Sequence, residues 1–189
     1  MTIARVFYLL KGNTMRHIIL NGRCGVGKST LIHALLEAIP LPVYGVITKK
    51  ETDGDGTSSV YIHTYGTKRI YTPENRIGLC GSGSHTAFPD IFDRFAESMV
   101  FPDDGVIVFD ELGFMETDAH RFTENVLHTL DSAPLVIAAV RDKQTPFLDA
   151  VRSHPRADVY PINEENRDSL RESLLGMLRS LFPDGFDRG

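Results

Sequence analysis

GRCGVGKS, residues 22–29, is the strongest indication of the fold, because it matches the phosphate-loop pattern G-x-x-x-x-G-K-[ST] at every fixed position. The apolar run HIIL, residues 17–20, precedes it, and a helix-like segment, residues 28–39, follows it until Pro40. This order of strand, glycine-rich loop and helix is the context that the motif requires. The candidate phosphate-binding residues are Gly22, Arg23, Cys24, Gly25, Val26, Gly27, Lys28, Ser29 and Thr30.

The residue types of the loop fit the binding of a nucleoside triphosphate with Mg²⁺. Glycines allow successive backbone N–H groups to turn toward phosphate oxygens, and the positive end of the following helix dipole points the same way. Lys28 is expected to reach the β- and γ-phosphate oxygens, and Ser29 to hold the magnesium ion. The alternative is a glycine-rich turn that contains a lysine by chance, and the complete match in the right context argues against it.

A second motif ends the most apolar predicted strand. Four apolar residues, 106–109, lead to Asp110 and Glu111, so two carboxylates stand where doubly wound sheets bind ligands. This is a Walker B pattern, in which Asp110 contacts magnesium and Glu111, a catalytic candidate, accepts a proton from an attacking water. The alternative for such a pair is a role in a helix cap or turn.

An acidic pair favours the P-loop branch in which another strand lies between the P-loop strand and the Walker B strand. If residues 135–140 form that strand, its carboxyl end brings Arg141 close to the γ-phosphate, where a cation stabilises the transition state. Arg141 and Lys28 therefore join Glu111 as catalytic candidates, and Lys143 is a weaker candidate for the role of Arg141. An ordinary surface arginine is the equal alternative for Arg141.

Strand-like and helix-like segments alternate along most of the chain, which predicts an α/β fold with a mainly parallel sheet and helices on both faces. A small β-rich insertion interrupts the alternation between residues 52 and about 75, with strands expected at 60–65 and 68–72 around Gly66-Thr67. The other expected strands are 43–48, 135–140 and 158–162, with a loop at 51–59. The other expected helices are 91–99, 118–130, 146–153 and 164–181.

Length and composition favour one cytoplasmic domain. A chain of 189 residues fits a single core, its formal charge of −5 gives no basic face for nucleic acid, and no apolar run is long enough for a membrane span. Two cysteines make no disulfide framework or zinc site, which indicates a reducing compartment. Residues 1–14 are interpreted as an N-terminal extension before a domain of residues 15–189; an edge strand or packing arm at 4–10 is the alternative.

With both motifs placed, the chain resembles the cancer-related nucleoside-triphosphatase family, also called the THEP type. The resemblance rests on the P-loop, on GVIT at residues 45–48, on DELGFME at 110–116 and on Glu165-Asn166-Arg167 before the last helix. It implies a RecA-like core and a magnesium-dependent enzyme that hydrolyses ATP, GTP and other nucleoside triphosphates to the diphosphate and phosphate.

The chain departs from the family at three places that bear on turnover and nucleotide preference. Arg23-Cys24 stands where the family has prolines, Phe114 where it has lysine, and Lys49-Lys50 where it has acidic residues. Asn166 and Arg167 follow the last strand, where P-loop proteins often contact the base or ribose, and we expect them to do so here. The alternative is a helix start capped by the preceding Asn163.

Two rival functions remain open at this level. A P-loop kinase could use Glu111 to deprotonate a hydroxyl of a small-molecule or nucleotide acceptor, although no arginine-rich lid is evident. A non-enzymatic nucleotide switch is the other rival, but Arg141-Asp142-Lys143-Gln144 does not match the N-K-x-D guanine signature. The nucleotide is the expected partner, without nucleic acid or membrane, and a protein partner is not indicated.

Overall fold

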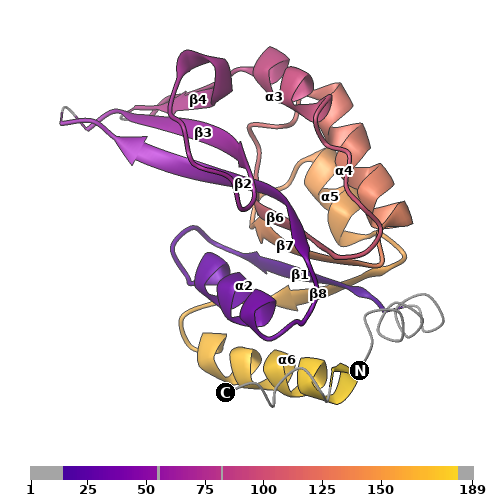
Figure 1. Ribbon diagram of the computed structural model, residues 1–189. Helices are drawn as coiled ribbons and strands as arrows, with labels where there is room; N and C mark the ends of the chain where they lie inside the picture. Colours follow the sequence, from indigo (N-terminus) through magenta and orange to yellow (C-terminus); the bar gives the residue numbers. More distant parts are fainter. Residues whose placement is uncertain (1–14, 55, 82, 183–189) are drawn as a thin grey trace.

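The sheet is continuous from the phosphate-loop strand to the insertion (Figure 1). The computed structural model describes residues 15–54, 56–81 and 83–182, and in these ranges eight strands form one sheet in the order β5-β4-β3-β2-β6-β7-β1-β8. The predicted extension, residues 1–14, lies outside the described residues.

The strands are β1 His17–Gly22, β2 Val43–Thr52, β3 Ser58–Thr64, β4 Arg76–Cys80, β5 His85–Ala87, β6 Val106–Leu112, β7 Leu135–Arg141 and β8 Ala157–Pro161. The helices are α2 Lys28–Glu37, α3 Pro89–Ala96, α4 His120–Ser132, α5 Pro146–Arg152 and α6 Arg167–Leu181, and a short 3₁₀ helix, η1, spans Pro73–Asn75.

Five adjacent strands, β2, β6, β7, β1 and β8, run parallel, so their carboxyl ends share one edge of the sheet. β7 lies between β1 and β6, which confirms the strand order expected from the acidic pair. The remaining strands, β3, β4 and β5, pair antiparallel and extend the sheet beyond β2. This arrangement confirms the predicted P-loop α/β fold with a β-rich insertion.

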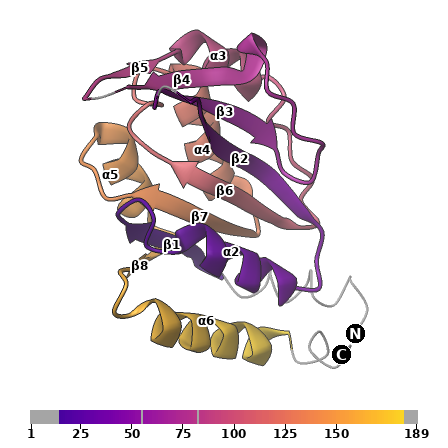
Figure 2. The same ribbon diagram turned by 90° about the vertical axis from the view of Figure 1, so that its left-hand side faces the viewer.

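Helices cover both faces of the parallel strands (Figure 2). On one face α2 and α6 pack over Ile18, Leu20 and Ile137, and on the other α3, α4 and α5 pack over Ile19 and neighbouring side chains. All residues of β7 before its last are buried, since a central parallel strand has helices above and below it. The two apolar layers hold the loops at the carboxyl edge in fixed positions.

The insertion differs from its prediction. Residues 68–72 form no strand; the partner of β3 is β4, which begins only at Arg76. The Asn75 side chain amide donates to the Ile70 carbonyl at 2.8 Å and to the Ile62 carbonyl at 3.0 Å, and these bonds hold residues 65–72 as an irregular connection. The predicted loop 51–59 is also shorter, because β2 runs to Thr52 and pairs with Ser58 of β3.

None of the helices in the described ranges combines the length and the apolar character that crossing a bilayer would need.

Candidate functional site

The phosphate loop connects the carboxyl end of β1 to the first residue of α2. Gly25 and Gly27 have φ angles of 82° and 101°, which side chains rarely adopt, and a Cβ on Gly22 would lie 2.4 Å from the Ile162 carbonyl oxygen. α2 begins at Lys28 with no acidic residue in its first turn. Its N-terminal N–H groups and positive dipole end therefore lack a carboxylate from their own helix and suit an anion.

Lys28 is buried at the centre of this loop. Its ammonium group donates to the Gly22 carbonyl at 2.8 Å and to the Arg23 carbonyl at 2.7 Å, and it lies 3.3 Å from Oε2 of Glu111. The side chain is only 3% exposed. Buried in this way, its charge is weakly screened by solvent and acts strongly on groups at the loop.

Ser29 and Asp110 bring two oxygen atoms together at the start of α2. The Ser29 hydroxyl donates to Oδ1 of Asp110 at 2.8 Å. Burial raises the pKa of Asp110, and the Ser29 hydrogen bond and the nearby Lys49 act in the opposite direction. A hydroxyl and a carboxylate are hard oxygen ligands of the type that Mg²⁺ takes, with phosphate oxygens and water completing its octahedron. The residues present therefore fit the expected metal.

Glu111 faces a different way from Asp110, across a cis peptide bond. Its carboxylate forms ion pairs with Lys28 and with Nε of Arg141, and its backbone N–H donates to the Thr48 hydroxyl at 3.3 Å. The structure thus brings all three catalytic candidates together. Two cations on one carboxylate make an electrostatic network in which each charge compensates another.

Arg141 ends β7, where the strand order predicts it. Its guanidinium carbon lies 5.8 Å from the ring centroid of Phe114, close enough for a cation–π contact, and the ring of His85 meets Phe114 edge-on at 5.3 Å. Phe114 therefore packs on the cation of the site. Lys143 offers its backbone carbonyl to Arg152 at 2.8 Å.

Glu116 is a residue of the site whose position the sequence reasoning missed. Both of its carboxylate oxygens accept the Gly113 N–H at 3.1 Å, which closes the turn that carries Phe114. Burial raises the pKa of Glu116 to about 7, and the carboxylate of Glu111 adds to the effect. The segment was recognised as part of a motif, but nothing in the spacing shows that this carboxyl group is buried.

Two cavities adjoin the loop. One, of about 360 Å³, extends from Cys24, Asp110 and Glu111 to the insertion, where Val60 and His85 line it. The second cavity, of about 520 Å³, lies between the phosphate loop and the segment after β8. Its lining residues are Arg23, Cys24, Val26, Asn163, Glu164 and Glu165.

The two predicted base or ribose contacts do not line the second cavity. The Asn166 side chain instead accepts the Asn163 N–H and donates to the Pro161 carbonyl, both at 2.8 Å, and so fixes the turn before α6. The Arg167 side chain lies beside the loop, with its Cδ 3.6 Å from where a Cβ on Gly27 would stand. Asn163, whose side chain accepts the N–H groups of Glu165 and Asn166, caps this turn.

Known proteins resemble this chain over most of its length. A family model described as NTPase matches residues 17–175. The nucleoside-triphosphatase THEP1 of Thermotoga maritima is 28% identical over 176 residues, which cover 91% of this chain and 97% of that protein. The cancer-related nucleoside-triphosphatase of Homo sapiens is 27% identical over 187 residues, covering 87% of this chain and 97% of the human protein.

A solved structure shares the fold. The crystal structure of THEP1 from the hyperthermophile Aquifex aeolicus superposes with a TM-score of 0.60 at 26% sequence identity, and the match covers 86% of this chain and 98% of that one. The residues that the family model matches, 17–175, span the parallel strands and both segments at their carboxyl edge.

Proposed function

The chain belongs to the NTPase family, and from this premise we propose that it hydrolyses nucleoside triphosphates, ATP and GTP among them, to the diphosphate and phosphate with Mg²⁺. Enzymes named nucleoside-triphosphatases are its relatives over nearly their full length. The observation that carries the proposal is the convergence of Lys28, Glu111 and Arg141 beside the Ser29–Asp110 pair. The two unpaired cysteines fit action in the cytoplasm.

In this proposal the loop N–H groups and Lys28 bind the β- and γ-phosphates, while Ser29 and Asp110 hold the magnesium ion. Bound magnesium neutralises phosphate charge as it develops. The nucleoside extends into the cavity between the loop and residues 163–165, since this cavity opens directly from Arg23 and Cys24. Asn166 and Arg167 then lie at the edge of the nucleoside site, where Asn166 fixes the turn before α6.

Glu111 and Arg141 carry the chemical step. A water oxygen forms a bond to the γ-phosphorus, the bond to the β–γ bridging oxygen breaks with its electron pair going to the diphosphate, and Glu111 takes a proton from the water. Arg141 stabilises the charge on the phosphoryl group as it is transferred to the water oxygen. Because the phosphates compete with Glu111 for Lys28, substrate binding frees this carboxylate from one of its two cations.

The test is Glu111→Gln, which keeps the shape of the side chain and removes its basicity. We expect turnover to fall by about 10²–10⁴, the range for a positioned general base. Triphosphate affinity should stay equal or become a few-fold tighter, because Lys28 and Arg141 lose a competing carboxylate. Phosphate release gives the rate, and titration with a fluorescent nonhydrolysable analogue gives the affinity.

Two further variants serve as controls for this result. Glu37→Gln makes the same change at an exposed site in the last turn of α2 and should leave both quantities unchanged. Lys28→Ala removes a charge that touches the phosphates and should weaken binding as well as turnover. A wild-type rate in Glu111→Gln would remove Glu111 as the base, and a wild-type protein that releases phosphate from none of the common triphosphates would overturn the proposal.

Phosphoryl transfer to a small hydroxyl compound is the second candidate function. It is favoured by the 360 Å³ cavity, which leads from Glu111 to Val60 and His85 of the insertion and gives an acceptor a place beside the base. Formation of diphosphate without an equal amount of free phosphate, in the presence of an alcohol, would identify this reaction.

A further inference from the structure

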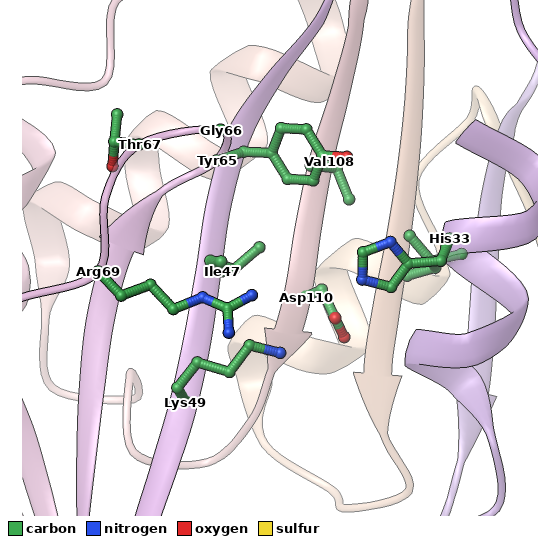
Figure 3. A pocket seen from close by; sticks show the side chains of 10 residues that line it. His33, Ile47, Lys49, Tyr65, Gly66, Thr67, Arg69, Val108 and Asp110 are labelled. Carbon is green, nitrogen blue, oxygen red and sulfur yellow. The ribbon is translucent and has the colours of Figure 1, made fainter. Parts of the chain in front are cut away.

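A further cavity, of about 260 Å³, lies on the α2 face of the sheet and adjoins the 360 Å³ cavity, with which it shares Lys49 and Asp110 (Figure 3). Ile47 of β2 and Val108 of β6 form its floor, Ile32 of α2 forms one wall, and the connection after β3, at Tyr65–Thr67, forms the other. No residue of the phosphate loop, 22–29, lines it. A ligand here would therefore occupy a place distinct from that of the triphosphate.

Three basic side chains from three different elements line this cavity. Figure 3 shows His33 of α2 on one side, and Lys49 of β2 with Arg69 of the connection on the other, all directed toward the Asp110 carboxylate. None of the three forms an ion pair with any residue in the described part of the chain. Asp110 in turn accepts its hydrogen bond from Ser29, not from any of the three.

Lys49 and Arg69 bring two positive charges to a cavity with one carboxylate, that of Asp110, and an anion bound between the two cations offsets the repulsion that remains. Arg and Lys are the side chains that proteins use for phosphate and carboxylate groups, with Arg supplying a planar, bidentate fork and Lys a point charge. The cluster at this end of the cavity therefore indicates an anionic group.

The other end of the cavity has a different character. The ring of Tyr65 lies near Val108 in Figure 3, and Ile47 and Val108 present apolar surface between the ring and the cations. Apolar surface of this kind favours a ring or another apolar group on the ligand. The cavity thus combines an apolar end with a basic end.

The irregular connection is held in the position that this cavity requires. The Asn75 side chain donates to the carbonyls of Ile62 and Ile70 and accepts the Thr72 N–H at 3.0 Å, which fixes the chain on both sides of Arg69. Such a preformed backbone lowers the ordering cost of binding.

We propose that this cavity binds a small organic anion, with a phosphate or carboxylate between His33, Lys49 and Arg69 and a ring or apolar body against Tyr65. The site goes beyond the hydrolysis of triphosphates, which needs no second ligand. Because Asp110 borders both this cavity and the Ser29 contact, the anion lies next to the proposed metal site. The ligand is therefore placed either to change the reactivity of the terminal phosphate or to accept the terminal phosphoryl group.

The experiment uses phenyl phosphate as the probe, titrated calorimetrically into the full chain saturated with Mg²⁺ and a nonhydrolysable triphosphate analogue. The analogue fills the phosphate loop, so the probe cannot bind there. We expect saturable binding, weakened at least about tenfold by Arg69→Gln or Lys49→Gln, a loss in the range of a charge-assisted hydrogen bond. Lys68→Gln, the matched control, removes the same charge beside Arg69 but outside the lining and should bind within about twofold of wild type.

Two further ligands identify the chemical group that the cavity binds. Phenol, which lacks the anionic group, should show no saturable binding, and benzoate compared with phenyl phosphate distinguishes a carboxylate site from a phosphate site. The inference is overturned if neither anion binds to the analogue-loaded protein, or if Arg69→Gln and Lys49→Gln bind as the wild type does. Because binding is measured without turnover, this outcome is independent of whether the protein hydrolyses triphosphates.

Discussion

Glu116→Gln is the substitution whose effect on the pH dependence of stability follows most directly from the structure. Glu116 is 3% exposed, and burial raises the pKa of its carboxyl group from 4.5 to about 7. A raised pKa in the folded state means that folding favours the protonated form. The resulting contribution to stability is complete below about pH 4.5 and is lost as the pH rises through about 7.

Over that interval the loss amounts to about 3 kcal/mol of unfolding free energy. Glutamine keeps a carbonyl oxygen for the Gly113 N–H but cannot ionise. The stability of Glu116→Gln relative to wild type should therefore increase by up to about 3 kcal/mol between pH 5 and pH 8. For a domain of this size that corresponds to roughly 6–12 °C in melting temperature.

The measurement is the melting temperature of both proteins at several pH values from 5 to 8, supported by urea unfolding at the two extremes. Groups that titrate equally in both proteins, His17 among them, cancel in the difference. Glu37→Gln, at an exposed carboxyl group, should give a curve parallel to the wild type. If Glu116→Gln also gives a parallel curve, Glu116 is not held neutral by burial and the reasoning fails.

Burial lowers the pKa of His17 to about 4, so its contribution to stability is complete above about pH 6.5 and is lost as the pH falls through about 4. In His17→Gln the melting temperature, measured by calorimetry, should fall less steeply as the pH is lowered toward 4. An unchanged acid dependence of the melting temperature would contradict this. For Asp110→Asn we expect the magnesium concentration for half-maximal phosphate release to rise at least about tenfold, because a neutral amide is a weaker ligand for a hard cation. An unchanged magnesium requirement would show that Asp110 is not a ligand.

The parallel strands and the phosphate loop could be predicted because their signals are local. Residues 22–29 are consecutive, so one motif specifies the turn, the lysine and the start of α2 together. The apolar run before Asp110 likewise identified β6, whose first five residues are buried. Placing β7 between β1 and β6 also succeeded, because an acidic pair is associated with one strand order.

The insertion shows where local preference fails. Residues 68–72, KRIYT, contain the residue types that favour strands, yet they remain irregular because the partner of β3 is chosen by the sheet as a whole. The deciding contacts come from Asn75, whose amide reaches Ile62, thirteen positions away. No window of neighbouring residues contains that information.

The phosphate loop, the acidic pair and the α/β alternation can be read from the amino-acid sequence, since each depends on residues that follow one another along the chain. The fold as a whole is needed to place Glu111 between Lys28 and Arg141, to bury Glu116, and to bring His33 and Arg69 to one cavity. These relations join residues far apart in the sequence through the strand order and the packing of helices on the sheet. Electrostatic interaction and burial depend on distance in space, which the order of residues along the chain does not specify.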